Sequence, residues 1–385
     1  MTFDSLLLLL AAASLFGWCW LMACRSAFWR ADQRMGGEHS GDLAGVRDRT
    51  GPTVSIVVPA RDEADVIARA VRSLLDQDYG AIAGIAVVDD QSTDGTAGAV
   101  PDDPRVRVLQ GCPHPVGWTG KLWAVAQGIA AMPPADFVWL TDADIAHSPS
   151  ELSALVAKAE DEELDLVSLM VKLRLETPWD RLLIPAFVFF FQKLYPFRRV
   201  NDPADRTAAA AGGSMLVRST ALARIGGIEA IRNELIDDCA LATAIKGTGG
   251  RIHIALAETT HSLRAYGSLG AIWSMVARSA FHQLRYSPLL LAGTGAAMAL
   301  LYLVPPVILL SLPLHGSYAT AACAALSWIA MACAEAPTLY RYGLSPWRGF
   351  ALPAAGLLYT LMTLDSARRH WAGHGGEWKG RAHAP

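Results

Sequence analysis

The sequence predicts an α/β protein in which a mostly parallel, three-layer sheet is flanked by transmembrane helices at the N- and C-terminal ends of the chain. Two observations lead to this class. Of the 385 residues, 52% are hydrophobic and only 18% are charged, whereas soluble domains carry about 25% charged residues. The charges are also unevenly spread, because long uncharged runs lie near both ends and short β-branched runs alternate with helical patterns between them.

The uncharged runs have the lengths expected of membrane spans. Residues 5–24 form a 20-residue stretch, enough for a helix of about 30 Å that crosses a bilayer core. A cleaved signal peptide is the alternative, but no basic segment precedes the apolar run. Residues 286–334 are 49 uncharged residues, with room for two spans joined by a turn at 312–317, and 349–364 is a marginal stretch of 16. We therefore expect an anchor at 1–25 and a transmembrane region of two or three helices at 286–366.

The basic residues predict how the chain is oriented. Arg25, Arg30 and Arg34 follow the first span and no basic residue precedes it, which places the next domain in the cytoplasm, with the anchor in the inner membrane. Four spans would put the basic tail at 367–385 outside the cytoplasm, against the positive-inside rule. Either the stretch 349–364 is re-entrant or the tail is an exception to that rule. The formal net charge of −3 argues against a nucleic-acid partner. The six cysteines have no CxxC spacing, so neither a disulfide framework nor a zinc site is expected.

Between the apolar ends we expect a linker at 26–52 and one α/β domain at 53–285. The alternation of β-branched runs with helical spacing predicts the domain's first elements. They are strands at 54–58, 85–88, 106–109 and 137–140, and a helix at 63–75. The apolar segment Leu182 to Phe191 is too short to span a membrane. It is either a buried helix or an interfacial helix that dips into the bilayer.

Three acidic clusters follow or open these elements: Asp89-Asp90 after the second strand, Asp142-Ala143-Asp144 after the fourth, and Asp237-Asp238 at the start of a helical stretch. Loops beyond the carboxyl ends of parallel strands line the ligand crevice of such sheets. Two of the three clusters therefore lie where ligands bind.

Each cluster has a candidate role and a structural alternative. Asp142 and Asp144 have the spacing to hold one Mg²⁺ or Mn²⁺ ion on a diphosphate, although Asp144 could instead cap the helix that begins near Glu151. Asp90 could accept hydrogen bonds from a nucleobase or a ribose hydroxyl, or belong to a turn. Asp238 lies at a helix N-terminus, which stabilises an acidic residue whatever its role. The same dipole would keep the carboxylate ionised, as a general base requires.

Six blocks occur in a fixed order between about residues 53 and 250: VSIVVPARDE, VVDDQSTDGT, GWTGKLWAVAQG, WLTDADI, AAGGSMLVRSTAL with IGGI, and ELIDDCAL. This order resembles glycosyltransferase family 2, whose members are inverting enzymes with the GT-A fold. With its flanking membrane pattern and long GWTGK block, the chain resembles most closely the hopanoid-biosynthesis-associated branch, and its layout is similar to that of ceramide glucosyltransferases. The resemblance implies a Rossmann-like, three-layer nucleotide-sugar-binding domain.

The resemblance also implies a donor site for a nucleoside-diphosphate sugar, expected to be a UDP-sugar. Pro59, Arg61 and Glu63 match the first nucleotide-binding loop, although family members more often carry Tyr-Asn-Glu where this chain has Arg-Asp-Glu. That departure leaves the role of Arg61 open, while Glu63 still matches. Asp90 is implied to contact the base of the donor.

Three further blocks match positions near the sugar and the diphosphate. The resemblance implies that Lys121 contacts the donor near its diphosphate, unless it is an ordinary surface lysine. It also implies that Asp142 lies against the donor and that Asp144 binds the metal. Gly212 and Gly213 would let the backbone approach the sugar or the acceptor, because glycine lacks a Cβ.

The last two matches concern the base and a membrane-proximal arginine. Asp238 matches the general base, with Asp237 where the family usually has Glu. The segment Gln283 to Tyr286 resembles the Gln-x-x-Arg-Trp element of membrane-embedded members, with one residue fewer and Tyr for Trp. Arg285 would then hold the diphosphate, or it is a positive-inside anchor at the membrane face.

These observations predict a membrane-bound, metal-dependent, inverting glycosyltransferase that moves a sugar to a lipid hydroxyl, with a hopanoid or related lipid as the acceptor that the resemblance implies. A polyprenyl phosphate acceptor is the close alternative. A sugar nucleotidyltransferase shares the three-layer fold but needs no base such as Asp238. A non-enzymatic scaffold is disfavoured because none of the acidic clusters is missing.

Overall fold

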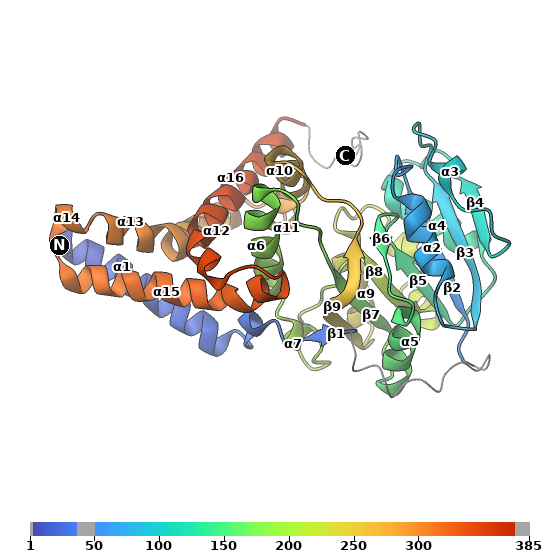
Figure 1. Cartoon of the computed structure of the whole chain (residues 1–385), viewed down its shortest axis with the longest axis horizontal. Helices are drawn as coiled ribbons and strands as arrows, with labels where there is room; N and C mark the ends of the chain where they lie inside the picture. The colour runs from blue at the N-terminus through green and yellow to red at the C-terminus, as the bar shows by residue number, and fades with distance from the viewer. Residues whose placement is uncertain (1–2, 37–50, 374–385) are drawn as a thin grey trace. The chain divides into compact units, whose positions relative to one another are not determined.

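The computed structural model describes residues 3–36 and 51–373. Within them the chain forms two compact units (Figure 1). The α/β unit comprises 33–36, 51–174 and 199–265, and the helical unit comprises 3–32, 175–198 and 266–373.

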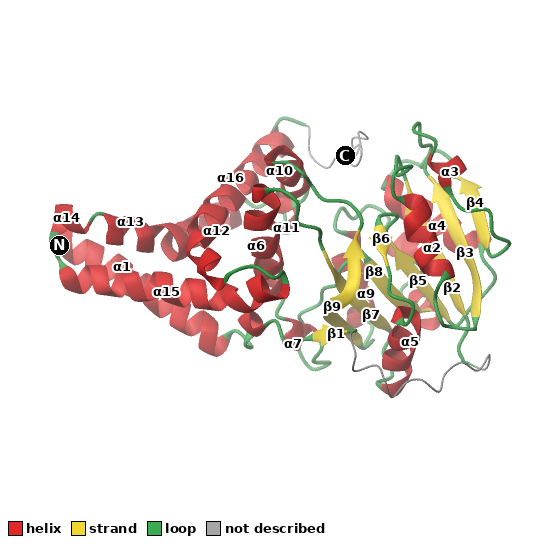
Figure 2. Cartoon of the chain, in the orientation of Figure 1, coloured by secondary structure: helices red, strands yellow, loops and turns green. Residues whose placement is uncertain are grey.

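The α/β unit is built on one sheet that contains all the strands of the described residues (Figure 2). Its strands are β1 (Arg34–Met35), β2 (Val54–Ala60), β3 (Ile82–Asp89), β4 (Val106–Gln110), β5 (Phe137–Thr141), β6 (Ile145–Ala146), β7 (Leu166–Lys172), β8 (Ser214–Arg218) and β9 (Ile252–Ser262). The spatial order is β1-β9-β7-β8-β5-β2-β3-β4, and β6 pairs with β9.

The four strands expected from the sequence are confirmed as β2, β3, β4 and β5. β2 pairs in parallel with β3 and β5, and β3 pairs in parallel with β4. β8 runs antiparallel to both of its neighbours, β5 and β7. The sheet is therefore mixed, and mostly parallel as expected.

Helices cover both faces of this sheet, which gives the three layers that the sequence predicts. β2 is buried along its whole length, and its side chains point alternately to the two faces. Ile56 belongs to the apolar cluster that includes Ile67 of α2 (Ile67–Leu75) and Leu152 of α5 (Glu151–Asp161). On the other face, α4 (Gly120–Ala131) lies so close that a Cβ on Gly128 would approach Val57 Cγ1 to 2.4 Å.

The helix expected at 63–75 begins later, at Ile67. Glu63 lies in the loop after β2, where its backbone N–H donates to Thr96 Oγ1 at 2.8 Å and its carboxylate pairs with Arg264. These tertiary contacts keep the loop out of the helix. The remaining helices of the α/β unit are α3 (Thr96–Ala99), α8 (Ser219–Arg224), η3 (Ile228–Ile231) and α9 (Asp237–Gly247).

The helical unit contains four helices long and apolar enough to cross a membrane, within the described residues: Phe3–Cys24, Pro288–Leu310, Tyr318–Arg341 and Pro346–Trp371. The first of them is α1 (Phe3–Cys24), and the third is α15 (Tyr318–Arg341). The second consists of α12 (Pro288–Met298), η4 (Ala299–Leu303) and α13 (Val304–Leu310). The fourth consists of η5 (Pro346–Ala351) and α16 (Leu352–Trp371). The marginal stretch 349–364 thus lies in a helix of sufficient length. The turn expected at 312–317 contains the short α14 (Leu312–His315).

Aromatic and polar contacts hold the long helices together. Trp18 of α1 is fully buried, and its indole N–H donates to the backbone oxygen of Leu301 at 2.9 Å. Ser327 of α15 donates to Ser14 of α1 at 3.2 Å. The smaller helices of the unit are η1 (Phe28–Arg30), α6 (Pro178–Leu194), α10 (Leu269–Ala277) and α11 (Ala280–Gln283), and α7 (Phe197–Val200) lies where the chain returns to the α/β unit.

The apolar segment Leu182 to Phe191 lies in α6 and belongs to the helical unit, although the sequence placed it inside the α/β domain. Most of its side chains are buried, and Tyr359 of α16 donates a hydrogen bond to the backbone oxygen of Leu183 at 2.8 Å. The segment is thus a packed helix among the long helices, as the buried-helix alternative requires. The expected 53–285 domain is consequently interrupted by 175–198 and ends earlier, at Ala265.

The expected linker at 26–52 includes η1 and β1, and its residues 37–50 lie outside the described residues. Likewise α16 covers the start of the expected tail at 367–385, and residues 374–385 lie outside the described part. All six cysteines fall within the described residues and are free.

Candidate active site

Acidic residues follow the carboxyl ends of the two parallel strands that flank β2 in the α/β unit. Asp90 comes directly after β3, and Asp142 directly after β5. The antiparallel β8 begins at Ser214, which pairs with Thr141 at the end of β5. The segment before β8 therefore reaches the same edge of the sheet. This is the edge at which open α/β sheets bind ligands.

Lys121 connects two of the acidic clusters. It lies in the first turn of α4, whose N-cap Thr119 accepts a hydrogen bond from the backbone N–H of Leu122. Its Nζ atom lies 3.0 Å from Asp142 Oδ1 and 3.0 Å from Asp237 Oδ2. Burial by itself would lower the pKa of Lys121, but the two carboxylates outweigh burial and hold this pKa above its ordinary value. Lys121 is therefore a fixed positive charge rather than a free surface lysine.

Asp238 lies next to this ion pair, in the first turn of α9. Its Oδ2 accepts a hydrogen bond from the backbone N–H of Gly212 at 2.9 Å, and its Oδ1 accepts one from the backbone N–H of Cys239 at 2.7 Å. Burial and the charge of Asp237 raise the pKa of Asp238 to about 6, against the opposing effect of Lys121. A carboxyl group in this environment can accept a proton near neutral pH.

Asp144 lies beside Asp142 at the same edge. Its Oδ2 accepts a hydrogen bond from Ser262 Oγ at 3.1 Å. Burial and the charges of Asp142 and Glu63 raise the pKa of Asp144 to about 6. Helix α5 has Ser150 at its N-cap position, so the alternative role of Asp144 as the cap is wrong. Within 3–36 and 51–373, no three His, Cys, Asp or Glu side chains converge as a ready-made metal site, so an ion here would need further ligands from substrate or water.

The loop after β2 contacts the loop after β3. The guanidinium of Arg61 donates to the backbone oxygen of Asp90 at 2.6 Å and lies 3.6 Å from Asp90 Oδ2. Asp90 is 1% exposed. Arg61, where the family more often has Tyr, therefore holds the residue expected to contact the base, while Glu63 forms an ion pair with Arg264 at 2.8 Å.

One cleft of the α/β unit collects several of the predicted residues. It is lined by Pro59, Lys121, Leu122, Val125, Leu140, Thr141, Asp142, Gly212, Met215, Ile228, Ile231, Asp237 and Leu241. A Cβ on Gly212 would lie 3.3 Å from Lys121 Nζ and 3.5 Å from Asp238 Oδ2, whereas a Cβ on Gly213 would lie 2.9 Å from Val171 Cγ1. Gly212 thus allows the close approach of charged groups, and Gly213 allows β7 to pack.

Arg285 is not part of the α/β unit that contains this edge. It lies in the helical unit, after α11, with a left-handed backbone (φ 52°) and with its backbone N–H donating to the carbonyl oxygen of His282 at 2.8 Å. Its contact with the diphosphate stays a prediction.

Sequence reasoning missed two residues that hold the predicted ones, Ser262 beside Asp144 and Arg264 beside Glu63. Ser262 is the last residue of β9 and Arg264 follows it closely, and the sequence pattern did not reveal this strand. Only the long-range pairing of β9 with β7 and β6 brings them to the site.

Comparison with known proteins agrees with this geometry. Residues 52–281 match the family described as Glycosyltransferase like family 2. The chain belongs to glycosyltransferase family 2. It is therefore a glycosyltransferase that uses a nucleotide sugar, and its mixed sheet is a GT-A-like fold.

One solved structure agrees with this chain at the level of the fold, and two others have weaker similarity. A mannosyltransferase from Pyrobaculum calidifontis in complex with GDP-Man and Mn²⁺ aligns with a TM-score of 0.52 at 20% identity, over 92% of this chain and 99% of that chain. A mycobacterial protein aligns with a TM-score of 0.41 at 19% identity, over 61% and 75% of the two chains. Mannosyl-3-phosphoglycerate synthase from Rubrobacter xylanophilus aligns with a TM-score of 0.41 at 18% identity, over 68% and 86%. No curated protein matches the sequence.

Proposed function

We propose that the protein is a membrane-bound, inverting glycosyltransferase that moves a sugar from a nucleoside-diphosphate sugar to the hydroxyl of a lipid at the cytoplasmic face of the inner membrane. The observation that carries this proposal is the bridge made by Lys121. Its ammonium lies 3.0 Å from Asp142 at the end of β5 and 3.0 Å from Asp237 at the start of α9. It thereby joins the donor side of the cleft to the helix that carries Asp238.

Asp238 acts as the general base. Each of its carboxylate oxygens accepts one backbone N–H, from Gly212 and from Cys239, which leaves lone pairs for the acceptor hydroxyl. The carboxylate takes the proton of that hydroxyl as the oxygen forms its bond to the anomeric carbon. The bond from this carbon to the diphosphate breaks on the opposite side, and the configuration inverts.

The candidate metal site fits a hard divalent cation. Asp142 and Asp144 supply carboxylate oxygens, the ligands that Mg²⁺ and Mn²⁺ prefer. The raised pKa of Asp144, caused by burial and by the charges of Asp142 and Glu63, reflects a repulsion that a cation would relieve. When bound, the metal would neutralise negative charge on the departing diphosphate. The P. calidifontis enzyme was solved with Mn²⁺, so Mn²⁺ is the first metal to assay.

The remaining donor contacts follow from the predicted positions. Arg61 and Asp90 would receive the base, which we propose to be uracil, and Lys121 would contact the diphosphate, with Arg285 as a second cation. GDP-Man belongs in the same assay because the P. calidifontis structure contains it.

The lipid acceptor is supported by the four helices that have the length and apolar composition of membrane spans. A hopanoid or related lipid is the first acceptor to test, because the sequence resembles that branch. A polyprenyl phosphate differs chemically, since a phosphomonoester is largely ionised at neutral pH and needs no base to deprotonate it.

The Asp238→Asn variant tests the base and the class of acceptor together. It keeps the size of the side chain and loses the proton acceptor, so we expect nucleoside diphosphate to bind and sugar transfer to fall by about 100-fold or more. Asp161→Asn, at an exposed position at the end of α5, is the matched control with the same loss of charge. Full activity of Asp238→Asn would remove the assignment of the base and favour a phosphate acceptor.

Two further measurements test the reaction and the metal. Asp144→Asn should abolish metal-dependent binding of nucleoside diphosphate. Mass spectrometry of lipids from cells with and without the protein should reveal a glycosylated lipid that only the former contain. Release of pyrophosphate instead of nucleoside diphosphate would identify a nucleotidyltransferase, and equal transfer to a soluble sugar would contradict the lipid acceptor.

A further inference from the structure

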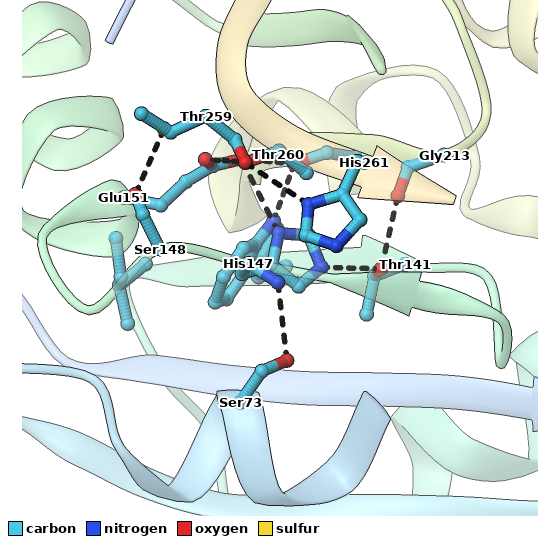
Figure 3. A network of polar contacts seen from close by, with 12 residues as sticks. Ser73, Thr141, His147, Ser148, Glu151, Gly213, Thr259, Thr260 and His261 are labelled. Atoms are coloured by element: carbon cyan, nitrogen blue, oxygen red, sulfur yellow. Dashed lines mark hydrogen bonds and ion pairs between the residues drawn. The ribbon is translucent and has the colours of Figure 1, made fainter. Parts of the chain in front are cut away.

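A buried polar network lies beneath the candidate active site, and its centre is His147 (Figure 3). The imidazole Nε2 lies 2.8 Å from Thr141 Oγ1, and Nδ1 lies 3.2 Å from Glu151 Oε1. The three residues are 2%, 6% and 5% exposed in the order Thr141, His147, Glu151. The backbone N–H of His147 also donates to Ser73 Oγ at 3.1 Å. Buried polar groups held at this many points have one defined arrangement.

The hydrogen bonds of Thr141 bear on which atom donates in its contact with Nε2 of His147. Thr141 Oγ1 donates its proton to the backbone oxygen of Gly213 at 2.9 Å. The contact between the same hydroxyl and Nε2 therefore requires Nε2 to donate. Glu151 faces the other ring nitrogen, with Oε1 3.2 Å from Nδ1.

Glu151 accepts hydrogen bonds on both oxygens. Thr260 of β9 donates to Oε2, and Ser214 of β8 donates to Oε1 at 3.5 Å. Ser214 in turn accepts from the indole N–H of Trp139 at 3.0 Å. Glu151 also lies in the first turn of α5, where the helix dipole stabilises a negative charge. These hydrogen bonds fix the carboxyl group of Glu151 beside Nδ1 of His147.

The network reaches both halves of the candidate active site. Thr141 immediately precedes Asp142. The chain that carries Asp142 and Asp144 continues through β6 (Ile145–Ala146) to His147. On the other side, the hydroxyl of Thr141 holds the carbonyl oxygen of Gly213. The neighbouring residue, Gly212, donates its backbone N–H to Asp238 at 2.9 Å. One hydroxyl thus connects the loop of the proposed metal ligands with the loop that orients the proposed base.

We propose that His147, oriented by Glu151, is a positioning residue that holds the Asp142 to Asp144 loop and the Gly212 to Gly213 loop in the geometry for sugar transfer. This inference rests on the proposed function. His147 acts through Thr141 and does not touch the substrate. The chemistry resembles the way outer-sphere carboxylates orient histidines near metal sites, where loss of such a partner weakens metal affinity or activity about 10- to 100-fold.

The sharpest test changes one atom of the network. Thr141→Val keeps the shape of the side chain and removes the hydroxyl, whereas Thr141→Ser keeps the hydroxyl. We expect Thr141→Val to weaken Mn²⁺-dependent binding of UDP or GDP, measured by calorimetry, by about 10-fold or more. The kcat should fall as well. Thr141→Ser should restore both.

Two other variants separate positioning from stability. Glu151→Gln keeps the volume and replaces a carboxyl oxygen that contacts the imidazole or Thr260 by an amide nitrogen. It should weaken the same binding if Thr141→Val does not fold. Ser55→Ala is the matched control, because Ser55 is 3% exposed and donates to the backbone oxygen of Pro133 at 3.1 Å, away from the network. We expect Ser55→Ala to lower the melting temperature without changing nucleotide binding.

The outcomes are distinguishable. Thr141→Val and Glu151→Gln variants that have lower melting temperatures but bind nucleotide and Mn²⁺ as the wild type does would overturn the positioning role. A wild-type protein that binds nucleotide and Mn²⁺ but transfers no sugar refutes the proposed function, and the binding series still tests the network. A wild-type protein that binds no nucleotide refutes both.

Discussion

Asp237→Asn should change the pH dependence of sugar transfer in a direction that the structure specifies. The pKa of Asp238 is raised to about 6, first by burial and then by the charge of Asp237. Only the ionised carboxylate accepts a proton, so activity is present above this pKa and is lost as the pH falls through it. One pH unit below the pKa, about a tenth of the base is ionised. The wild-type kcat/KM near pH 5 should then be about a tenth of its plateau value.

Removing the charge of Asp237 takes away one cause of the raised pKa of Asp238. The ionised fraction at the lower pH then increases, and the ratio of kcat/KM between about pH 5 and pH 8 should rise above a tenth. Lys121→Met should move the ratio the opposite way, because Lys121 lowers the pKa of Asp238. The two variants thus have opposite signs, which a general loss of stability would not produce.

The assay is the release of nucleoside diphosphate by detergent-solubilised enzyme at both pH values. Metal is saturating at each pH, because Asp144 also has a pKa near 6 and protons compete with the ion. Absolute rates should fall in Asp237→Asn, since Lys121 loses one of its two ion-pair partners, so the ratio is the relevant quantity. Asp161→Asn should leave the ratio unchanged. An unchanged or smaller ratio in Asp237→Asn would refute the assignment of Asp238 as the titrating base.

Three other measurements test the structure more locally. Burial and the nearby Lys158 lower the pKa of His253 to about 4 from its ordinary value of 6.5. Between these two pH values the unfolded state binds more protons than the folded state. Up to about 3 kcal/mol of stability should therefore be lost as the pH falls through that window. His253→Gln should remove this part of the pH dependence in denaturant unfolding of the protein. Gly212→Ala places a Cβ 3.3 Å from the ammonium of Lys121 and should reduce kcat. Gly98→Ala, whose Cβ would have nothing within 4 Å, should leave kcat unchanged. Equal effects of the two variants would contradict the role of crowding at Gly212. Trp18→Ala removes a fully buried side chain and should lower stability by about 3 to 5 kcal/mol in thermal unfolding, and a loss below about 1 kcal/mol would contradict tight packing around it.

The parts of the fold that sequence reasoning predicted are those in which local pattern and position agree. The β-branched runs at β2, β3 and β5 are buried central strands, and an acidic residue directly after such a strand must lie at its carboxyl end whatever the rest of the chain does. For this reason Asp90 and Asp142 could be placed at one edge in advance. Asp238 could be placed at a helix N-terminus for a similar local reason.

Segments whose surroundings are set by distant parts of the chain were less predictable. The apolar run Leu182 to Phe191 packs with the long helices rather than with the sheet, and hydrophobicity alone does not specify the partner of an apolar face. The strands β7, β8 and β9 were not anticipated, and they bring Ser262 and Arg264 to the site. The structure also differs from the expected 63–75 helix, because tertiary hydrogen bonds of Glu63 outweigh local helical spacing.

The chemical class of this protein was therefore contained in its sequence, because six blocks in a fixed order resemble glycosyltransferase family 2. The long uncharged runs likewise predicted helices long and apolar enough to cross a membrane. Tertiary structure decided how the charges are paired. Lys121 bridges Asp142 and Asp237, and the hydroxyl of Thr141, which contacts the imidazole of His147, connects two loops far apart in sequence. The contact between Thr141 and Gly213 depends on the insertion of the antiparallel β8 between β5 and β7. The spatial order of strands in a sheet produces no periodic pattern in the sequence.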